Sequence, residues 1–96
     1  MRSLILLLPA LLAACATVGD PPVHGETPGR TCDAAGTDRF IGQAGTSESG
    51  AAILGATHSA TLRWAPPGYA LTMDFRADRV TVALDAGYKI TGIHCG

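Results

Sequence analysis

The residues of this chain best suited to chemistry are its three histidines and three cysteines, and their spacing limits what they can do. A catalytic site needs a nucleophile beside a base, or a metal ion held by converging ligands. His24 lies in a proline-rich stretch, His58 follows a helical pattern and His94 adjoins a cysteine, so we expect them at unrelated places. The sequence carries no enzyme signature, and we predict neither catalytic activity nor a cofactor.

The first cysteine follows an N-terminal leader. Its apolar run, residues 4–12, is much shorter than the roughly 20 residues needed to span a bilayer. The run ends in Leu12-Ala13-Ala14-Cys15, which resembles the bacterial lipobox, where the cysteine is lipidated and becomes the first mature residue. A plain signal peptide with an incidental cysteine is the alternative. The resemblance implies a leader over residues 1–14 and lipidation of Cys15. Because Ala16 rather than Asp follows, it also implies an outer-membrane anchor with the protein facing the periplasm.

Lipidation of Cys15 would leave an even pair, Cys32 and Cys95, in an oxidising compartment where disulfides persist. A bridge between them would join the two ends of the remaining chain and contribute about 4 kcal/mol in the chain-entropy model. Zinc binding by these cysteines with His94 is the alternative. Two widely separated cysteines lack the paired spacing of structural zinc sites, so we expect a disulfide and no metal.

Charge and composition limit the partners and the number of domains. The net charge is −1 without a basic cluster, and the single Trp, two Tyr and two Phe offer few rings for stacking bases, so we exclude nucleic acid. Residues 15–31 contain Pro21-Pro22 and Pro28-Gly29 without apolar periodicity, which predicts a lipidated cysteine and a flexible tether. Residues 32–96 then form one domain.

Local patterns in residues 32–96 predict one helix and three short strands. Thr46-Ser47 is a helix N-cap signal with Glu48 in the first turn, and an apolar stretch follows to about Thr57. Gly50 and Gly55 weaken this helix. Extended segments are predicted at residues 61–65, 80–84 and 89–93. The expected fold is α+β, with one helix packed on a small sheet.

Residues 68–80 have two incompatible interpretations. Apolar and polar side chains alternate through Tyr69, Leu71, Met73 and Phe75, then again from Val80 to Leu84. This period is typical of a β-hairpin with a turn at Ala77-Asp78. It is equally typical of an extended loop that leads into a strand. Periodicity alone does not separate the two.

The motifs within and on both sides of this segment resemble those of a known family of peptidase inhibitors. Small bacterial lipoproteins and fungal elastase inhibitors share an early cysteine, an Ile-Gly-Gln segment, Pro-Gly, Thr-Met-Asp-aromatic-Arg and a terminal Cys-Gly. Here these are Cys32, Ile41-Gly42-Gln43, Pro67-Gly68, Thr72 to Arg76, and Cys95-Gly96. The chain also resembles the related potato inhibitor I family of serine protease inhibitors in the same segment. The resemblance covers residues 32–96 and implies a potato inhibitor I-like fold, an exposed, extended protease-binding loop and a disulfide between the two cysteines.

The resemblance also implies roles for individual residues. Met73 would precede the scissile bond within a reactive-site loop formed by Leu71, Thr72, Met73, Asp74, Phe75 and Arg76. Arg79 would support this loop by bonding its carbonyls and the side chain of Thr72 or Asp74. Plant inhibitors often carry a second arginine two positions later, where this chain has Thr81, so rigidity must come from Arg76, Arg79 and the disulfide.

We therefore expect a monomeric, lipid-anchored serine protease inhibitor that forms one-to-one complexes. The unbranched apolar side chain of Met73 favours elastase-, chymotrypsin- or subtilisin-like targets. The alternative is an envelope lipoprotein that uses the same fold for a structural role or another partner.

Overall fold

The structure, a computed structural model, describes residues 23–69 and 74–96. Within them the chain forms a short 3₁₀ helix η2 (Thr37–Phe40), the α-helix α2 (Ser47–Thr57), and strands β1 (Thr61–Ala65), β2 (Arg79–Leu84) and β3 (Ile90–Cys95). This is the predicted α+β arrangement of one helix and a small sheet. No helix in the described ranges is long and apolar enough to cross a membrane. The predicted leader and Cys15 lie outside them.

Helix α2 forms where the sequence predicts it because both of its ends are capped. At the start, the Thr46 hydroxyl accepts a hydrogen bond from the Ser49 amide (3.1 Å), and the Ser49 hydroxyl accepts one from the Thr46 amide (2.9 Å). This reciprocal pair satisfies two amides that lack partners within the helix. At the end, His58 adopts a left-handed conformation with φ 58° and its amide bonds back to the last turn.

One face of the sheet packs on α2 and encloses the core. Gly50 faces the ring of Trp64 so closely that a Cβ atom there would lie 2.9 Å from Trp64 Cζ2. The glycine that weakens the helix locally therefore permits the close approach of helix and sheet. The buried apolar side chains are Phe40, Ile53, Val80, Val82, Leu84 and Ile90.

The sheet has the order β1-β2-β3, with β1 parallel to β2 and β2 antiparallel to β3. The third strand begins at Ile90, inside the predicted segment 89–93, and continues to Cys95. Because β2 has a partner strand on each edge, it has no free edge to pair with residues 69–75. The strand pairing of the hairpin interpretation is therefore wrong, although the turn predicted at Ala77-Asp78 is present.

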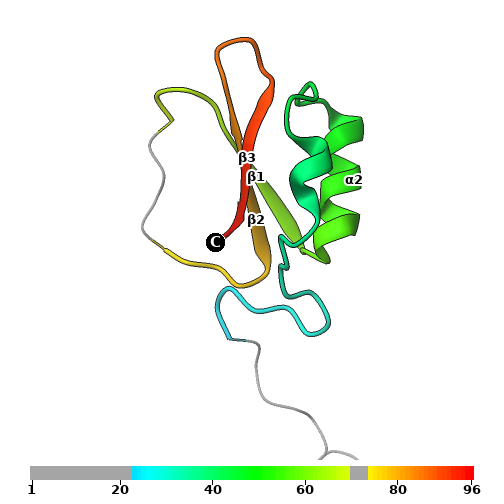
Figure 1. The fold of residues 1–96 in the computed structure, drawn as a ribbon. Helices are drawn as coiled ribbons and strands as arrows, with labels where there is room; N and C mark the ends of the chain where they lie inside the picture. The colour runs from blue at the N-terminus through cyan, green and yellow to red at the C-terminus, as the bar shows by residue number, and fades with distance from the viewer. Residues whose placement is uncertain (1–22, 70–73) are drawn as a thin grey trace, which may run out of the picture.

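Residues 66–78 connect the parallel strands β1 and β2. A parallel pair requires a crossover rather than a tight turn, and the described ends of this crossover, residues 66–69 and 74–78, lie on the side of the sheet away from α2 (Figure 1). It begins with a turn in which the Tyr69 amide donates to the Pro66 carbonyl (3.0 Å). Gly68 has φ +80° there, as the third position of a type II turn after Pro67 requires. Connections longer than about 12 residues are uncommon in small domains and often have a binding role, so residues 66–78 are a candidate for the functional site.

Candidate functional site

The predicted reactive-site residues fall into two groups. Leu71, Thr72 and Met73 lie outside the described residues. Asp74, Phe75 and Arg76 are described and lead towards β2, and the Phe75 side chain is 67% exposed. We call residues 74–78 the loop flank.

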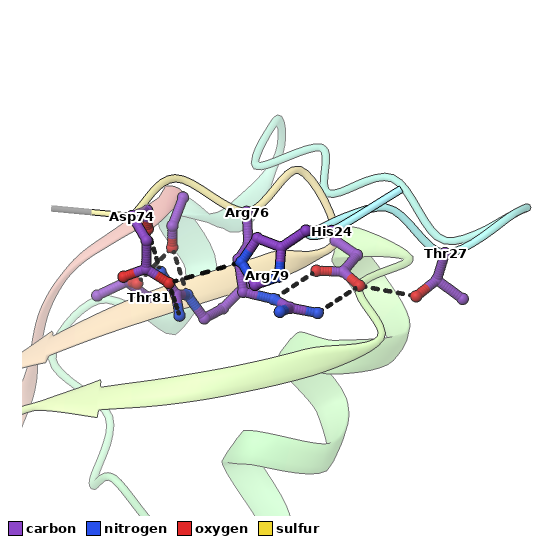
Figure 2. Close-up of polar contacts among 8 residues, drawn as sticks. His24, Thr27, Asp74, Arg76, Arg79 and Thr81 are labelled. Carbon is purple, nitrogen blue, oxygen red and sulfur yellow. Dashed lines mark hydrogen bonds and ion pairs between the residues drawn. The ribbon is translucent and has the colours of Figure 1, made fainter. Parts of the chain in front are cut away.

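Arg79 ties the loop flank to the sheet. It begins β2 and points away from the helix, and only 9% of it is exposed. Its Nη2 donates to the Asp74 carbonyl (2.8 Å), its Nη1 lies 3.9 Å from Asp74 Oδ2, and its Nε donates to the Gly96 carbonyl (3.0 Å) (Figure 2). The structure thus brings Arg79 against Asp74, one of the two partners expected for it. The planar guanidinium group of Arg79 therefore fixes both the backbone of the loop flank and the backbone of the residue after β3.

Thr81 stands where the plant inhibitors often carry a second arginine, and it acts on the same carbonyl. Its hydroxyl donates to the Gly96 oxygen (2.9 Å) and accepts from Nε of Arg63 on β1 (3.2 Å). The Gly96 amide in turn donates to the Arg79 carbonyl (2.9 Å). Arg63 on the neighbouring strand is therefore linked to the Gly96 oxygen through the hydroxyl of Thr81.

Arg76 pairs with Asp78, two residues further along the loop flank. Its Nε and Nη2 each lie 3.1 Å from a carboxylate oxygen of Asp78, and the Thr27 hydroxyl donates to Asp78 Oδ2 at 2.7 Å. Asp78 is only 1% exposed. The hydrogen bonds from Thr27 and Arg76 lower the pKa of the Asp78 carboxyl, outweighing the opposite effect of burial. Asp78 therefore stays ionised as a buried anchor for the loop flank.

The described part of the predicted tether, residues 23–31, makes specific contacts with the domain. The Asp78 amide donates to the carbonyl of the buried Gly25 (3.0 Å), and His24 Nε2 lies 4.0 Å from Asp74 Oδ2. Sequence reasoning missed Gly25, Thr27 and Asp78 as site residues. Arg76 and Asp78 lie in a turn closed by the hydrogen bond from the Arg79 amide to the Arg76 carbonyl (3.3 Å), and no periodic pattern in the sequence marks their pairing.

The predicted disulfide between Cys32 and Cys95 is confirmed. The Cys32 amide also donates to the Ala77 carbonyl (2.8 Å), so the bridge is attached to the loop flank through Cys32. Since each sulfur is bonded to the other, the cysteines are not available to the zinc site considered as an alternative. In residues 23–69 and 74–96, no three His, Cys, Asp or Glu side chains gather where they could hold a metal ion.

Comparison with known proteins gives a consistent result. The sequence model of the peptidase inhibitor I78 family matches residues 32–96. Among solved structures, the fold is similar to that of the elastase inhibitor AFUEI in its crystal form II, with 29% sequence identity and a TM-score of 0.50. That match covers 62% of this chain and 81% of the inhibitor. No curated protein sequence matches the chain.

Proposed function

The chain belongs to the peptidase inhibitor I78 family, and from this premise we propose that it inhibits serine proteases through residues 66–78, with Met73 preceding the scissile bond. The observation that carries the proposal is the bonding of Arg79 to the backbone and side chain of Asp74. Proteins of such a family are generally not enzymes, and this one would act by occupying its target.

The chemistry of peptide cleavage explains why the anchoring of Asp74 matters. Cleavage after Met73 would make Asp74 the new amino-terminal residue, which in an ordinary substrate diffuses away. Here Arg79 would hold Asp74 beside the acyl-enzyme, where its amine can re-form the bond. Such preorganisation also lowers the entropy cost of binding an extended segment. A substrate-like loop held in this way is cut slowly and released poorly.

The side chain of Met73 would determine which class of protease the protein inhibits. It is unbranched and apolar, which suits the primary pockets of elastase-, chymotrypsin- and subtilisin-like enzymes and offers no charge to a trypsin-like pocket. Its position in the sequence, between Pro67-Gly68 and the arginine-held Asp74, resembles the reactive position of potato inhibitor I-like loops, which supports this role.

The proposal includes a location. The resemblance of residues 12–15 to a lipobox supports a protein anchored by a lipid on Cys15 to the outer membrane and facing the periplasm, where it meets one protease molecule as a monomer. Replacement Cys15→Ala should abolish membrane association in a bacterial host. A Cys15→Ala protein that still fractionates with membranes would contradict the anchor without touching the inhibitor proposal.

The inhibitory activity is tested by titrating the purified protein against elastase-, chymotrypsin-, subtilisin- and trypsin-like enzymes. We expect stoichiometric inhibition of at least one of the first three, and Met73→Lys should redirect inhibition towards the trypsin-like enzyme. Failure of the wild type at micromolar concentration would contradict the proposed function and favour a structural envelope protein. Unchanged selectivity of Met73→Lys would exclude Met73 as the contact residue.

A further inference from the structure

The segment before the first disulfide cysteine packs on the loop flank, although it lies outside the region matched by the family model, residues 32–96. It turns back on itself, with the Arg30 amide donating to the Thr27 carbonyl (2.9 Å), before Cys32 enters the domain. Its inner residues Gly25 and Thr27 both bond to Asp78. Figure 2 shows Thr27 and His24 on the same side of the loop flank as Arg76.

Gly25 contacts the loop flank with its backbone. It has φ +81°, and a Cβ atom there would lie 3.1 Å from Arg76 Cα and 3.3 Å from the Phe75 carbonyl oxygen. Only glycine combines this conformation with such an approach. The contact places one backbone against another at the residues that follow Asp74, so movement of either segment displaces the other.

Thr27 shares the buried carboxylate of Asp78 with Arg76. One oxygen of this carboxylate, Oδ2, accepts from both Thr27 (2.7 Å) and Arg76 Nη2 (3.1 Å). Hydrogen bonds to a charged group are stronger and more directional than those between neutral groups. The Thr27 hydroxyl therefore fixes the carboxylate that fixes Arg76, which lies two residues after Asp74.

We propose that residues 24–27 form a brace that positions the loop flank for protease binding, so that the inhibitory unit of this chain begins before Cys32. The inference rests on the proposed function. The brace holds the loop flank at Arg76 and Asp78, whereas Arg79 holds it at Asp74. Without it the flank would keep its attachments to the sheet and to the Cys32 amide, and the cut loop would release its new amino terminus more readily.

Two pairs of substitutions in the full-length chain separate positioning from stability. Gly25→Ala is matched by Gly29→Ala, because Gly29 has a similar φ of +77° but no atom within 4 Å of its added Cβ. Thr27→Val is matched by Thr37→Val, because Thr37 also donates a 2.7 Å hydrogen bond but to Ala34, before η2. In each pair the backbone φ or the hydrogen-bond length is similar, and only the first member acts on the loop flank.

The measurements are the inhibition constant, the rate at which protease cuts the loop, the thermal midpoint, and the hydrogen exchange of the amides of residues 74–78. We expect Gly25→Ala and Thr27→Val to weaken inhibition roughly tenfold relative to their controls and to speed both loop cleavage and amide exchange, at similar thermal midpoints. Equal inhibition and exchange within each pair would overturn the proposal. If the wild type inhibits no protease, the proposed function fails, and amide exchange alone decides whether the brace exists.

Discussion

The two faces of strand β2 are both buried, but they are held by different forces. Val80 and Val82 face α2 with no exposed area, and they pack in the apolar core. Arg79 and Thr81 face the other way, and they are buried with hydrogen bonds to Asp74 and Gly96. A single strand thus carries a hydrophobic core on one side and a polar support on the other.

The difference separates what keeps the domain folded from what holds its loop. Apolar burial is non-directional and scales with area, so the helix side supplies free energy without fixing any one atom. A hydrogen bond contributes less net free energy but fixes a donor against an acceptor. We therefore expect substitutions on the helix side to change stability more than inhibition, and those on the loop side to do the reverse.

The largest effect should come from the disulfide, because it serves both faces. It closes a loop of 63 residues in sequence, and its loss by Cys32→Ser with Cys95→Ser should lower the free energy of unfolding by about 4 kcal/mol. Inhibition should weaken as well, since Cys32 bonds to Ala77 in the loop flank. Urea unfolding of the wild type with and without reductant checks the stability effect, and equal midpoints would refute it.

On the helix side, Ile53→Ala should cost the next largest free energy. Ile53 is fully buried between the helix and the sheet, and truncation of a buried isoleucine costs about 2–5 kcal/mol. At temperatures where the variant stays folded, its inhibition constant should match that of the wild type. A loss of inhibition in a fully folded Ile53→Ala protein would show that the two faces are not separable.

On the loop side, Arg79→Lys should weaken inhibition strongly and lower the stability only modestly. Lysine keeps the charge but cannot bond Asp74 and Gly96 with a planar fork, so the unfolding free energy should fall by about 1–2 kcal/mol and inhibition by tenfold or more. The matched control is Arg39→Lys, an exposed arginine whose Nη1 donates to the Gly36 carbonyl at 2.9 Å. Equal inhibition by the two variants would remove Arg79 from the support of the loop.

The smallest effect should be a change in folding stability that appears only at acidic pH. Because the pKa of Asp78 is lower in the folded protein than in the unfolded chain, where aspartate has a pKa of about 3.9, the unfolded chain takes up the proton first as the pH falls. The stabilisation is complete above about pH 4 and is lost as the pH falls through the lower folded pKa. Asp78→Asn should flatten this part of the curve of thermal midpoint against pH. An equally steep acid loss in the variant would assign it to other groups.

Local signals in the sequence predict most of the fold, but they do not predict the contacts between distant segments. The Thr46 cap, the Pro67-Gly68 turn and the alternation in residues 80–84 each specify conformation within a few residues. The parallel pairing of β1 with β2 depends on the whole crossover, and no short pattern encodes it. The contacts of Gly25 and Thr27 with Asp78 join residues about 50 positions apart through backbone and single polar groups. Such contacts leave no periodicity, which is why this segment was predicted to be a tether.

The central claim is that the polar face of the sheet holds Asp74 as the residue just after the point of cleavage. The most direct test is to incubate the protein with an elastase-, chymotrypsin- or subtilisin-like enzyme until intact and cut forms reach equilibrium, and to map the cut by mass spectrometry. We predict one cut, between Met73 and Asp74, and re-formation of intact protein when the purified cut form is returned to the enzyme. A cut elsewhere, such as after the exposed Tyr69 or Phe75, or a cut form that is never rejoined, would contradict it.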